Sequence, residues 1–215
     1  MVGVIKCVKH LTRKSSSPAK SQLAGTRKKL RAPYLGRYEK NTIQSNQIEF
    51  ESMKNKDEVI IRAPLPGEYG WIVQVHGQSY AEKFGWGEEF ECIVAKIMVE
   101  YLGVISSEKQ ACFIAEVNGR PEGCVMLVEN GQDEGKLRVM FVSENIRGRG
   151  VGTLLTNAVL AKAKDIGYKS LSLWTTNNQV EARELYKKIG FTLTSESPNT
   201  SFAKGSYDEE WKMKI

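Results

Sequence analysis

The sequence contains no long apolar run. No stretch approaches the roughly 18 to 20 apolar residues that cross a bilayer, and the N-terminus lacks the continuous apolar core of a signal peptide. We therefore expect a soluble, cytoplasmic protein without a membrane span. C-x-x-C spacing is also absent, so we expect no metal site and four buried, reduced cysteines: Cys7, Cys92, Cys112 and Cys124.

Acidic residues are absent from the first 38 positions. Residues 1–52 carry 11 Lys and Arg against three Glu, a net charge of +8, whereas residues 53–215 have a net charge of −2. A segment so basic and so poor in large apolar residues cannot bury enough surface to offset the entropy lost on ordering. We interpret residues 1–52 as a disordered tail and residues 53–215 as one folded domain.

Several roles stay open for residues 1–52. A plain solvated tail, a mitochondrial transit peptide, and a contact for nucleic acid or a membrane surface all agree with a basic segment that lacks acidic residues. Met53 opens a domain-like stretch and is a further candidate for the natural start. The charge pattern alone does not choose among these roles.

Residues 59–215 show the periodicities of alternating strands and helices. Apolar residues recur from Phe90 to Tyr101 at helical spacing, which predicts an amphipathic helix. Asn118-Gly119 between two apolar runs predicts a β-hairpin. The predicted order is a strand from 59, helices over 67–84 and 90–101, strands over 112–117, 123–129 and 137–142, a helix from 151 ended by Gly167, a strand over 170–175, a helix over 182–189, a strand from 190 and a last strand within 202–215.

The most informative stretch is LRVMFVSENIRGRGVGT, residues 137–153, in which a strand-like run passes into a helix through glycines. Because glycine lacks a Cβ, Gly148, Gly150 and Gly152 let successive backbone N–H groups turn toward one point beside the positive end of the helix dipole. Such an arrangement binds phosphate. Thr153 stands where a dinucleotide fingerprint requires glycine, and the Gly-Lys-Ser/Thr of a nucleotide-triphosphate loop is absent, so both are excluded.

Arg147-x-x-Gly150-x-Gly152 matches the Arg/Gln-x-x-Gly-x-Gly/Ala motif, through which the sequence resembles the GNAT acetyltransferases. The stretch ARELYKKIGF, residues 182–191, is similar to a second element of that family. The resemblance implies the α/β (α+β) GNAT fold. Its central sheet is mixed and mostly antiparallel, has about seven strands splayed between the fourth and fifth, and is flanked by four helices.

One subset of the family is more similar. PGEYGWIVQVHGQSYAEKFGW, GYKSLSLWT and SFAKGSYDEEWKMKI resemble the acetyltransferase half of proteins that fuse a MarR-type winged helix to a GNAT domain. Residues 1–52 are too short and too poor in apolar periodicity to build a winged helix. A regulatory function is therefore not implied with the fold.

The resemblance also implies a site for acetyl-CoA. Backbone amides and arginines of the glycine loop hold the pyrophosphate, Arg147 being the stronger candidate of the two arginines, and the edge of the fourth strand bonds pantetheine in the manner of an added strand. The implied cofactor-binding residues are Phe141, Val142, Arg147, Gly148, Arg149, Gly150, Val151, Gly152 and Thr153.

Tyr186 occupies the position of the family's general acid, where a protonated phenol can give a proton to the leaving thiolate. It also continues an apolar helical stripe, so a structural role stays open. The general base is not identified, because Glu116, Glu129 and Glu144 near strand ends compete with a water chain. His76, the one histidine of residues 53–215, is a candidate for either substrate contact or packing.

The resemblance implies an N-acetyltransferase that moves an acetyl group from acetyl-CoA to a primary amine by direct attack in a ternary complex. The alternative is a non-catalytic acyl-CoA-binding sensor or interaction module whose basic tail contacts nucleic acid. Gln179 stands where the family often has an Asn that contacts pantetheine, so this contact stays open. Pairing into a homodimer is also left open. Small amines, peptides and antibiotics are all compatible with the aromatic residues near the expected acceptor pocket: Trp71, Tyr80, Trp86 and Tyr207.

Overall fold

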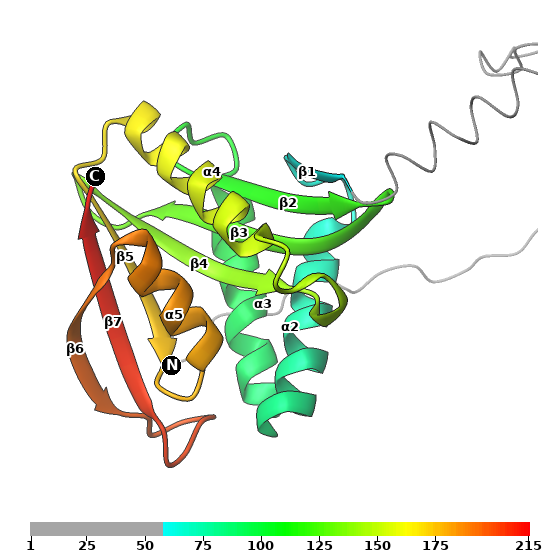
Figure 1. The fold of residues 1–215 in the computed structure, drawn as a ribbon, viewed down its shortest axis with the longest axis vertical. Coiled ribbons are helices and arrows are strands. Elements are labelled where there is room, and N and C mark those ends of the chain that lie inside the picture. Colours follow the sequence, from blue (N-terminus) through cyan, green and yellow to red (C-terminus); the bar gives the residue numbers. More distant parts are fainter. Residues whose placement is uncertain (1–57) are drawn as a thin grey trace, which may run out of the picture. The chain divides into compact units, whose positions relative to one another are not determined.

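Residues 58–215 fold around one mixed β-sheet with helices on both faces (Figure 1). The computed structural model describes these residues, and the predictions for residues 1–52 and Met53 lie outside them. The strand order is β1-β2-β3-β4-β5-β7-β6, and β4 and β5 form the parallel pair. The elements are β1 (Val59–Arg62), α2 (Glu68–Phe84), α3 (Glu88–Gly103), β2 (Ala111–Val117), β3 (Arg120–Glu129), β4 (Glu134–Val142), the 3-10 helix η1 (Glu144–Ile146), α4 (Val151–Ile166), β5 (Ser170–Thr176), α5 (Val180–Ile189), β6 (Thr192–Pro198) and β7 (Tyr207–Lys214).

This architecture confirms the predicted mixed, mostly antiparallel sheet of seven strands with four α-helices. The hairpin between β2 and β3 turns at Asn118 and Gly119, whose φ values of 53° and 75° are those that a two-residue hairpin turn requires. Helix α4 ends at Gly167, which takes a left-handed φ of 94° and closes the helix C-terminus. Local sequence signals therefore set these boundaries.

The last two strands lie close to their predicted positions. β6 starts at Thr192, two residues later than predicted, and β7 starts at Tyr207, within the predicted range and after an irregular segment over residues 199–206. Buried Asn199 explains this irregular segment, because its Oδ1 accepts hydrogen bonds from the backbone N–H groups of Ser201 and Ala203, both at 3.0 Å. These bonds hold the segment as a loop rather than as an extension of β7.

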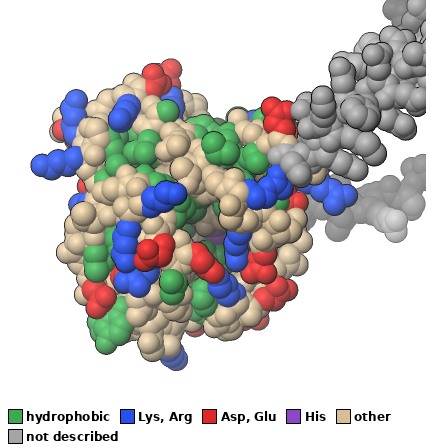
Figure 2. Space-filling model, viewed as in Figure 1, with side chains coloured by type: hydrophobic (Ala, Val, Ile, Leu, Met, Phe, Trp, Pro, Cys, Tyr) green, Lys and Arg blue, Asp and Glu red, His purple; other side chains and the backbone are tan. Residues whose placement is uncertain are grey.

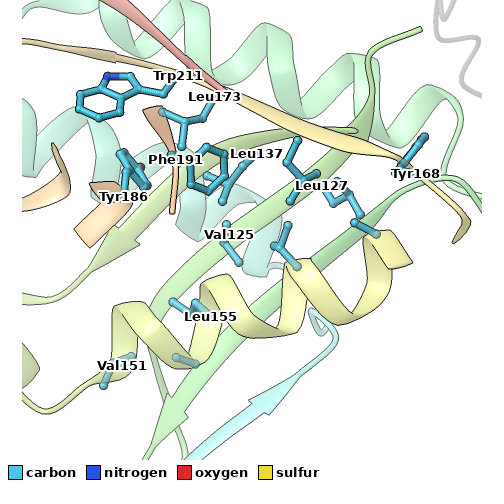
Figure 3. Close-up of a cluster of buried hydrophobic side chains, with 14 of the residues drawn as sticks. Val125, Leu127, Leu137, Val151, Leu155, Tyr168, Leu173, Tyr186, Phe191 and Trp211 are labelled. Atoms are coloured by element: carbon cyan, nitrogen blue, oxygen red, sulfur yellow. The ribbon is translucent and has the colours of Figure 1, made fainter. Parts of the chain in front are cut away.

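Two hydrophobic clusters pack on opposite faces of the sheet. The first lies beneath α4 and α5 and includes Leu155, Leu173 and Trp211 (Figure 3). The second lies beneath α2 and α3 and includes Ile72 and Met126. Full burial of each such side chain contributes about 1.5–3 kcal/mol, so both helical layers hold the sheet in place.

Strands β4 and β5 pair only over their first residues. The parallel register runs from Glu134 opposite Ser170 to Leu137 opposite Leu173, although both strands continue beyond these points. On its other edge, β4 has a β-bulge against β3, and Val139 within it has a φ of 46°. A positive φ is costly for a β-branched residue, so the surrounding packing must impose this bend.

Among residues 58–215, no helix combines the length and the apolar character that a membrane span requires. Cys112 and Cys124 are free and buried, as predicted. Cys92 is free but exposed, contrary to the prediction. It lies two positions from Phe90 and from Val94 on α3, and since these two residues face the core, its side chain is on the opposite side of the helix.

Substitution of Gly135 tests the packing at the centre of the sheet. A Cβ on Gly135 would lie 2.7 Å from a methyl carbon of Leu127 and 2.9 Å from carbons of Leu171 and Tyr168. We expect Gly135→Ala to lower the free energy of unfolding by about 1–3 kcal/mol, because a filled core must shift to accept a methyl group. Urea denaturation measures the change.

The matched control is Gly70→Ala. Gly70 is an exposed residue of α2, and a Cβ added there meets nothing within 4 Å. This change should raise the free energy of unfolding by up to about 1 kcal/mol through helix propensity. Equal stability of Gly135→Ala and the unaltered protein would contradict the tight packing.

Candidate functional site

Two cavities lie where β4 and β5 part. The loop cavity, about 410 Å³, is lined by the end of β4, the glycine loop, the start of α4 and α5. The inner cavity, about 350 Å³, is lined by β4, β5, α3 and the loop that precedes β7. Tyr80, Met140 and Gln179 line both cavities, so the two adjoin. Figure 2 shows basic and acidic side chains around a recess on this side of the molecule.

The glycine loop leaves backbone N–H groups unpaired at the start of α4. Gly148 and Gly150 have φ values of 75° and 80°, a region that glycine adopts without a Cβ penalty. Helix α4 then begins at Val151 with no side-chain cap and no acidic residue in its first turn. The N–H groups of this turn have no partner within the helix, so they and the positive helix end are available to an anion at the loop cavity.

Gly152 has a different role from the other two glycines. Its φ is not left-handed, but a Cβ there would lie 3.0 Å from Cδ2 of Leu185 on α5. The interpretation that all three glycines turn the backbone therefore holds for Gly148 and Gly150 only. Gly152 lets α4 and α5 approach each other beside the loop cavity.

Arg147 ties the loop to β4. Its Nε donates a hydrogen bond to the carbonyl oxygen of Val142 at 3.1 Å, and its Nη1 pairs with Glu144 at 3.0 Å. A guanidinium group has five N–H donors, so further donors remain for a ligand. Lys83 and Lys188 also line the loop cavity, and Lys83 pairs with Glu181 at 2.6 Å.

The structure brings most of the predicted cofactor-binding residues to one place. The predicted residues that line the loop cavity are Phe141, Val142, Arg147, Gly148, Gly150, Val151, Gly152 and Thr153. Arg149 is exposed and does not line it. Gln179 lines both cavities, and its Oε1 accepts a hydrogen bond from the Tyr80 hydroxyl at 3.2 Å. The side-chain amide of Gln179 therefore stands at the junction.

An aromatic cluster closes one side of the inner cavity. Tyr80, Phe84, Trp86, Phe90 and Phe202 contact one another with ring centroids 4.8 to 5.7 Å apart. Phe202 belongs to the loop before β7, so these contacts hold that loop against α2 and α3.

The aromatic residues predicted near the acceptor differ in position. Tyr80 lines the inner cavity, whereas Trp86 is buried within the aromatic cluster. Trp71 packs edge-on against Phe141, and Tyr207 is 43% exposed. Of the four, Tyr80 alone lies where an acceptor in the inner cavity would contact it.

His76 is neutral and lines the inner cavity. Burial lowers its pKa from 6.5 to about 4. The Nδ1–H donates to the carbonyl oxygen of Ile72 at 2.8 Å, which leaves Nε2 as an acceptor. Nε2 is buried and has no partner among the described residues, and the ring stacks on Tyr80. The His76 side chain therefore packs against Tyr80 and also keeps one ring nitrogen, Nε2, available as an acceptor.

Tyr186 also lines the inner cavity, although its helix, α5, lies on the opposite face of the sheet from α3. The gap between β4 and β5 lets residues from both faces reach this space. Tyr186 is 4% exposed and packs edge-on against Phe191, and burial raises the pKa of its phenol above the usual value. The hydroxyl is therefore protonated at neutral pH and can act as a donor.

The carboxylates suggested by the sequence are elsewhere. Glu116 pairs with Arg62 at 2.6 Å, Glu129 pairs with Lys109 at 2.7 Å, and neither lines a cavity. Glu144 is engaged by Arg147. Sequence reasoning missed several polar residues of the inner cavity, among them Lys136, Arg138, Thr175 and Asp208. No local motif marks them, because they come from three strands that only the sheet brings together.

Comparison with known proteins identifies the family of the chain. The model of the acetyltransferase (GNAT) family matches residues 73–191, more than half of the chain, and includes the glycine loop. An uncharacterized N-acetyltransferase of Methanocaldococcus jannaschii is 32% identical over 94 residues, and the N-acetylaspartate synthetase of Xenopus tropicalis is 32% identical over 103 residues. The matches cover 41% and 47% of this chain, and the chain spans 42% and 38% of these relatives.

Solved structures share the fold. A GNAT acetyltransferase from Staphylococcus aureus superposes with a TM-score of 0.61 at 16% identity, covering 73% of this chain and 99% of that one. The yncA structure from Salmonella typhimurium, described with its cofactor acetyl-CoA, has a TM-score of 0.60 at 14% identity. The superposition covers 73% of this chain and 93% of the yncA chain. With the family match over its central sheet and glycine loop, the chain belongs to the acetyltransferase (GNAT) family.

Proposed function

We propose that this chain transfers an acetyl group from acetyl-CoA to the primary amine of an acceptor by direct attack within a ternary complex. The observation that carries the proposal is the junction of the loop cavity and the inner cavity at Tyr80, Met140 and Gln179. Two ligands in adjoining cavities have their reacting atoms held together, which removes much of the entropic barrier. Relatives named N-acetyltransferase and N-acetylaspartate synthetase support an amine as the acceptor.

The residues of the loop cavity fit acetyl-CoA. The uncapped start of α4 and Arg147 suit its pyrophosphate. Beyond Leu137, the edge of β4 that faces β5 is unpaired, so the backbone at Phe141 and Val142 can bond pantetheine. Acetyl-CoA supplies the acetyl group as an activated thioester, and the acetyl-CoA in the yncA structure supports it as the cosubstrate.

Two groups near the junction suit the chemistry of the transfer. The β-bulge at Val139 leaves backbone N–H groups of β4 outside the regular ladder, where they can stabilise a developing oxyanion. The protonated hydroxyl of Tyr186 can give its proton to the leaving thiolate. The amine loses one proton and the thiolate gains one, so the transfer is balanced. No side chain is assigned here as the general base.

The finer predictions about the whole protein stay predictions. These are the similarity to the acetyltransferase half of MarR-GNAT fusions, cytoplasmic or mitochondrial location, pairing into a homodimer, and nucleic-acid contacts through residues 1–52. The alternative of a non-catalytic acyl-CoA sensor is separated from the proposed enzyme by an assay. Thiol release that requires an added amine supports the enzyme, and tight CoA binding without turnover supports the sensor.

Substitution of Gly150 tests the loop. Alanine at a φ of 80° costs about 1–2 kcal/mol, so Gly150→Ala should distort the loop and weaken CoA binding by about tenfold. Isothermal titration calorimetry with CoA measures the dissociation constant. Gly131→Ala is the matched control, because Gly131 has a φ of 97° but lines neither cavity. If both variants bind CoA like the unaltered protein, the loop is not the pyrophosphate site.

Substitution of Tyr186 tests proton donation. Tyr186→Phe should lower kcat by about 100-fold and leave the dissociation constant of CoA unchanged, since only the hydroxyl is removed. Steady-state kinetics and calorimetry give the two values. Tyr168→Phe is the control, because the equally buried Tyr168 uses its hydroxyl to bond the Lys109 carbonyl at 2.8 Å. It should lower stability by about 1 kcal/mol without changing kcat. An unchanged kcat in Tyr186→Phe rules out the proposed role.

A further inference from the structure

Two cationic side chains enter the inner cavity from β4. Lys136 and Arg138 both line the cavity, and residues two apart on a strand lie on the same face, about 7 Å from each other. Neither side chain makes a hydrogen bond or an ion pair with another residue of the range 58–215. Burial and the nearby charge of Arg138 lower the pKa of Lys136. Two like charges in a partly buried space indicate a place for an anion.

Carboxylates that surround Lys136 have other partners. Glu134 is bound by Lys212 at 3.0 Å and by the Ser172 hydroxyl at 2.9 Å, and the exposed Glu210 accepts a hydrogen bond from Ser195 at 3.3 Å. Both reach Lys136 electrostatically, but neither lines the inner cavity. The cationic pair is therefore the part of this charge network that faces the empty space.

One carboxylate, that of Asp208, also lines the inner cavity, but it lies farther along the strand direction than Lys136. Asp208 on β7 lies opposite Thr176 of β5, whereas Lys136 on β4 lies opposite Ser172. Four residues of strand separate these two levels, a distance of about 13 Å, and Arg138 lies between them. The side chain of Asp208 is fixed by the Nδ2 of Asn199, which donates to it at 2.7 Å. Charge in the cavity is thus divided, with the cations toward the start of β4 and the carboxylate toward its end.

Unpartnered polar atoms in the wall of the inner cavity point to a ligand. Thr175 and His76 are each 2% exposed and line the cavity, yet Thr175 Oγ1 and His76 Nε2 lack a hydrogen-bond partner in the described part of the chain. Buried polar atoms without partners cost free energy, which a bound polar molecule recovers. The hydroxyl offers a donor and the neutral imidazole nitrogen offers an acceptor.

From this arrangement we propose that the acceptor is an amino acid, an amine that also carries a carboxylate, and that Lys136 and Arg138 bind this carboxylate. The inference rests on the proposed acetyl transfer for the role of the amine. The carboxylate lies toward the start of β4, and the amine lies toward Asp208 and Met140, where the two cavities meet. Arg138 suits a planar carboxylate because its donors form a fork that bonds both oxygens.

The orientation also gives a reason for selectivity. An amine without a carboxylate would leave the two cations without a counterion in a partly desolvated cavity. The cavity therefore favours acceptors that bring a negative charge. During the transfer the amine nitrogen forms a bond to the acetyl carbon as the bond from that carbon to sulfur breaks. The carboxylate takes no part in this exchange and serves only to place the amine.

The experiment compares matched acceptors with the full chain and acetyl-CoA. Each proteinogenic L-amino acid is assayed as a free acceptor beside its carboxamide. Ethylamine and O-phosphoethanolamine are further acceptors. At least one amino acid should have a KM about 10- to 100-fold below that of its carboxamide, the range expected for a lost charge-assisted contact. The carboxamide has the less basic amine and the larger neutral fraction, so intrinsic reactivity favours the opposite order.

Arg138→Gln should raise the KM for the preferred amino acid by about 10-fold or more, leave the KM for acetyl-CoA unchanged, and bring the acid-to-amide ratio toward one. Arg120→Gln removes the same charge from an exposed residue outside both cavities and should change none of these values. Thermal denaturation checks that both variants fold. Equal KM values for acids and amides in the unaltered protein overturn the proposal, as does a preference for phosphoethanolamine, which assigns the cations to phosphate.

Calorimetric titration of the CoA-loaded protein with the same amino acids separates the two proposals. Amino-acid binding that Arg138→Gln weakens and Arg120→Gln does not, without any thiol release, overturns the acetyl transfer and keeps the carboxylate site. Turnover of amines that lack a carboxylate, with no binding of amino acids, overturns the carboxylate site and keeps the acetyl transfer. Absence of amino-acid binding to the unaltered protein overturns the carboxylate site in every case.

Discussion

Strands β4 and β5 stop pairing after Leu137 and Leu173, and both cavities lie where the strands part. A sheet that loses its ladder exposes backbone donors and acceptors, which must find other partners. In this chain they become available on the edge of β4 that faces the loop cavity. The same gap lets Tyr186 on one face and the α3 residues on the other line a single space. One interruption in pairing therefore creates the free edge and the point where the two cavities meet.

The gap persists because packing on both faces holds the strands around it. The cluster beneath α4 and α5 fixes the first half of β4 and β5, and the aromatic cluster around Trp86 fixes the loop that closes the inner cavity. Val139 keeps a positive φ in the β-bulge under this constraint. Strain that the packed layers sustain is thus located in the wall of the inner cavity, and strained backbone is commonly found at functional sites.

The charges of the site are divided by depth. The helix start and Arg147 present positive potential at the loop cavity, and Lys136 and Arg138 present it within the inner cavity. The residues that line both cavities, Tyr80, Met140 and Gln179, carry no charge at physiological pH, since burial raises the pKa of the Tyr80 phenol above its usual value. The positive groups of the two cavities are thus separated by uncharged side chains.

The sequence by itself determined the elements of the fold and the glycine loop, because helix stripes, the Asn118-Gly119 turn and the spacing from Arg147 to Gly152 are local signals. It also identified the part of the loop-cavity lining that lies in one continuous segment, residues 141–153, but not the part that α2 and α5 contribute. Only the tertiary structure decided the inner cavity. Lys136, Thr175 and Asp208 come from three strands whose register places them together, and the irregular segment before β7 depends on side-chain bonds of Asn199. Such contacts depend on long-range pairing, for which single-sequence periodicity carries no signal.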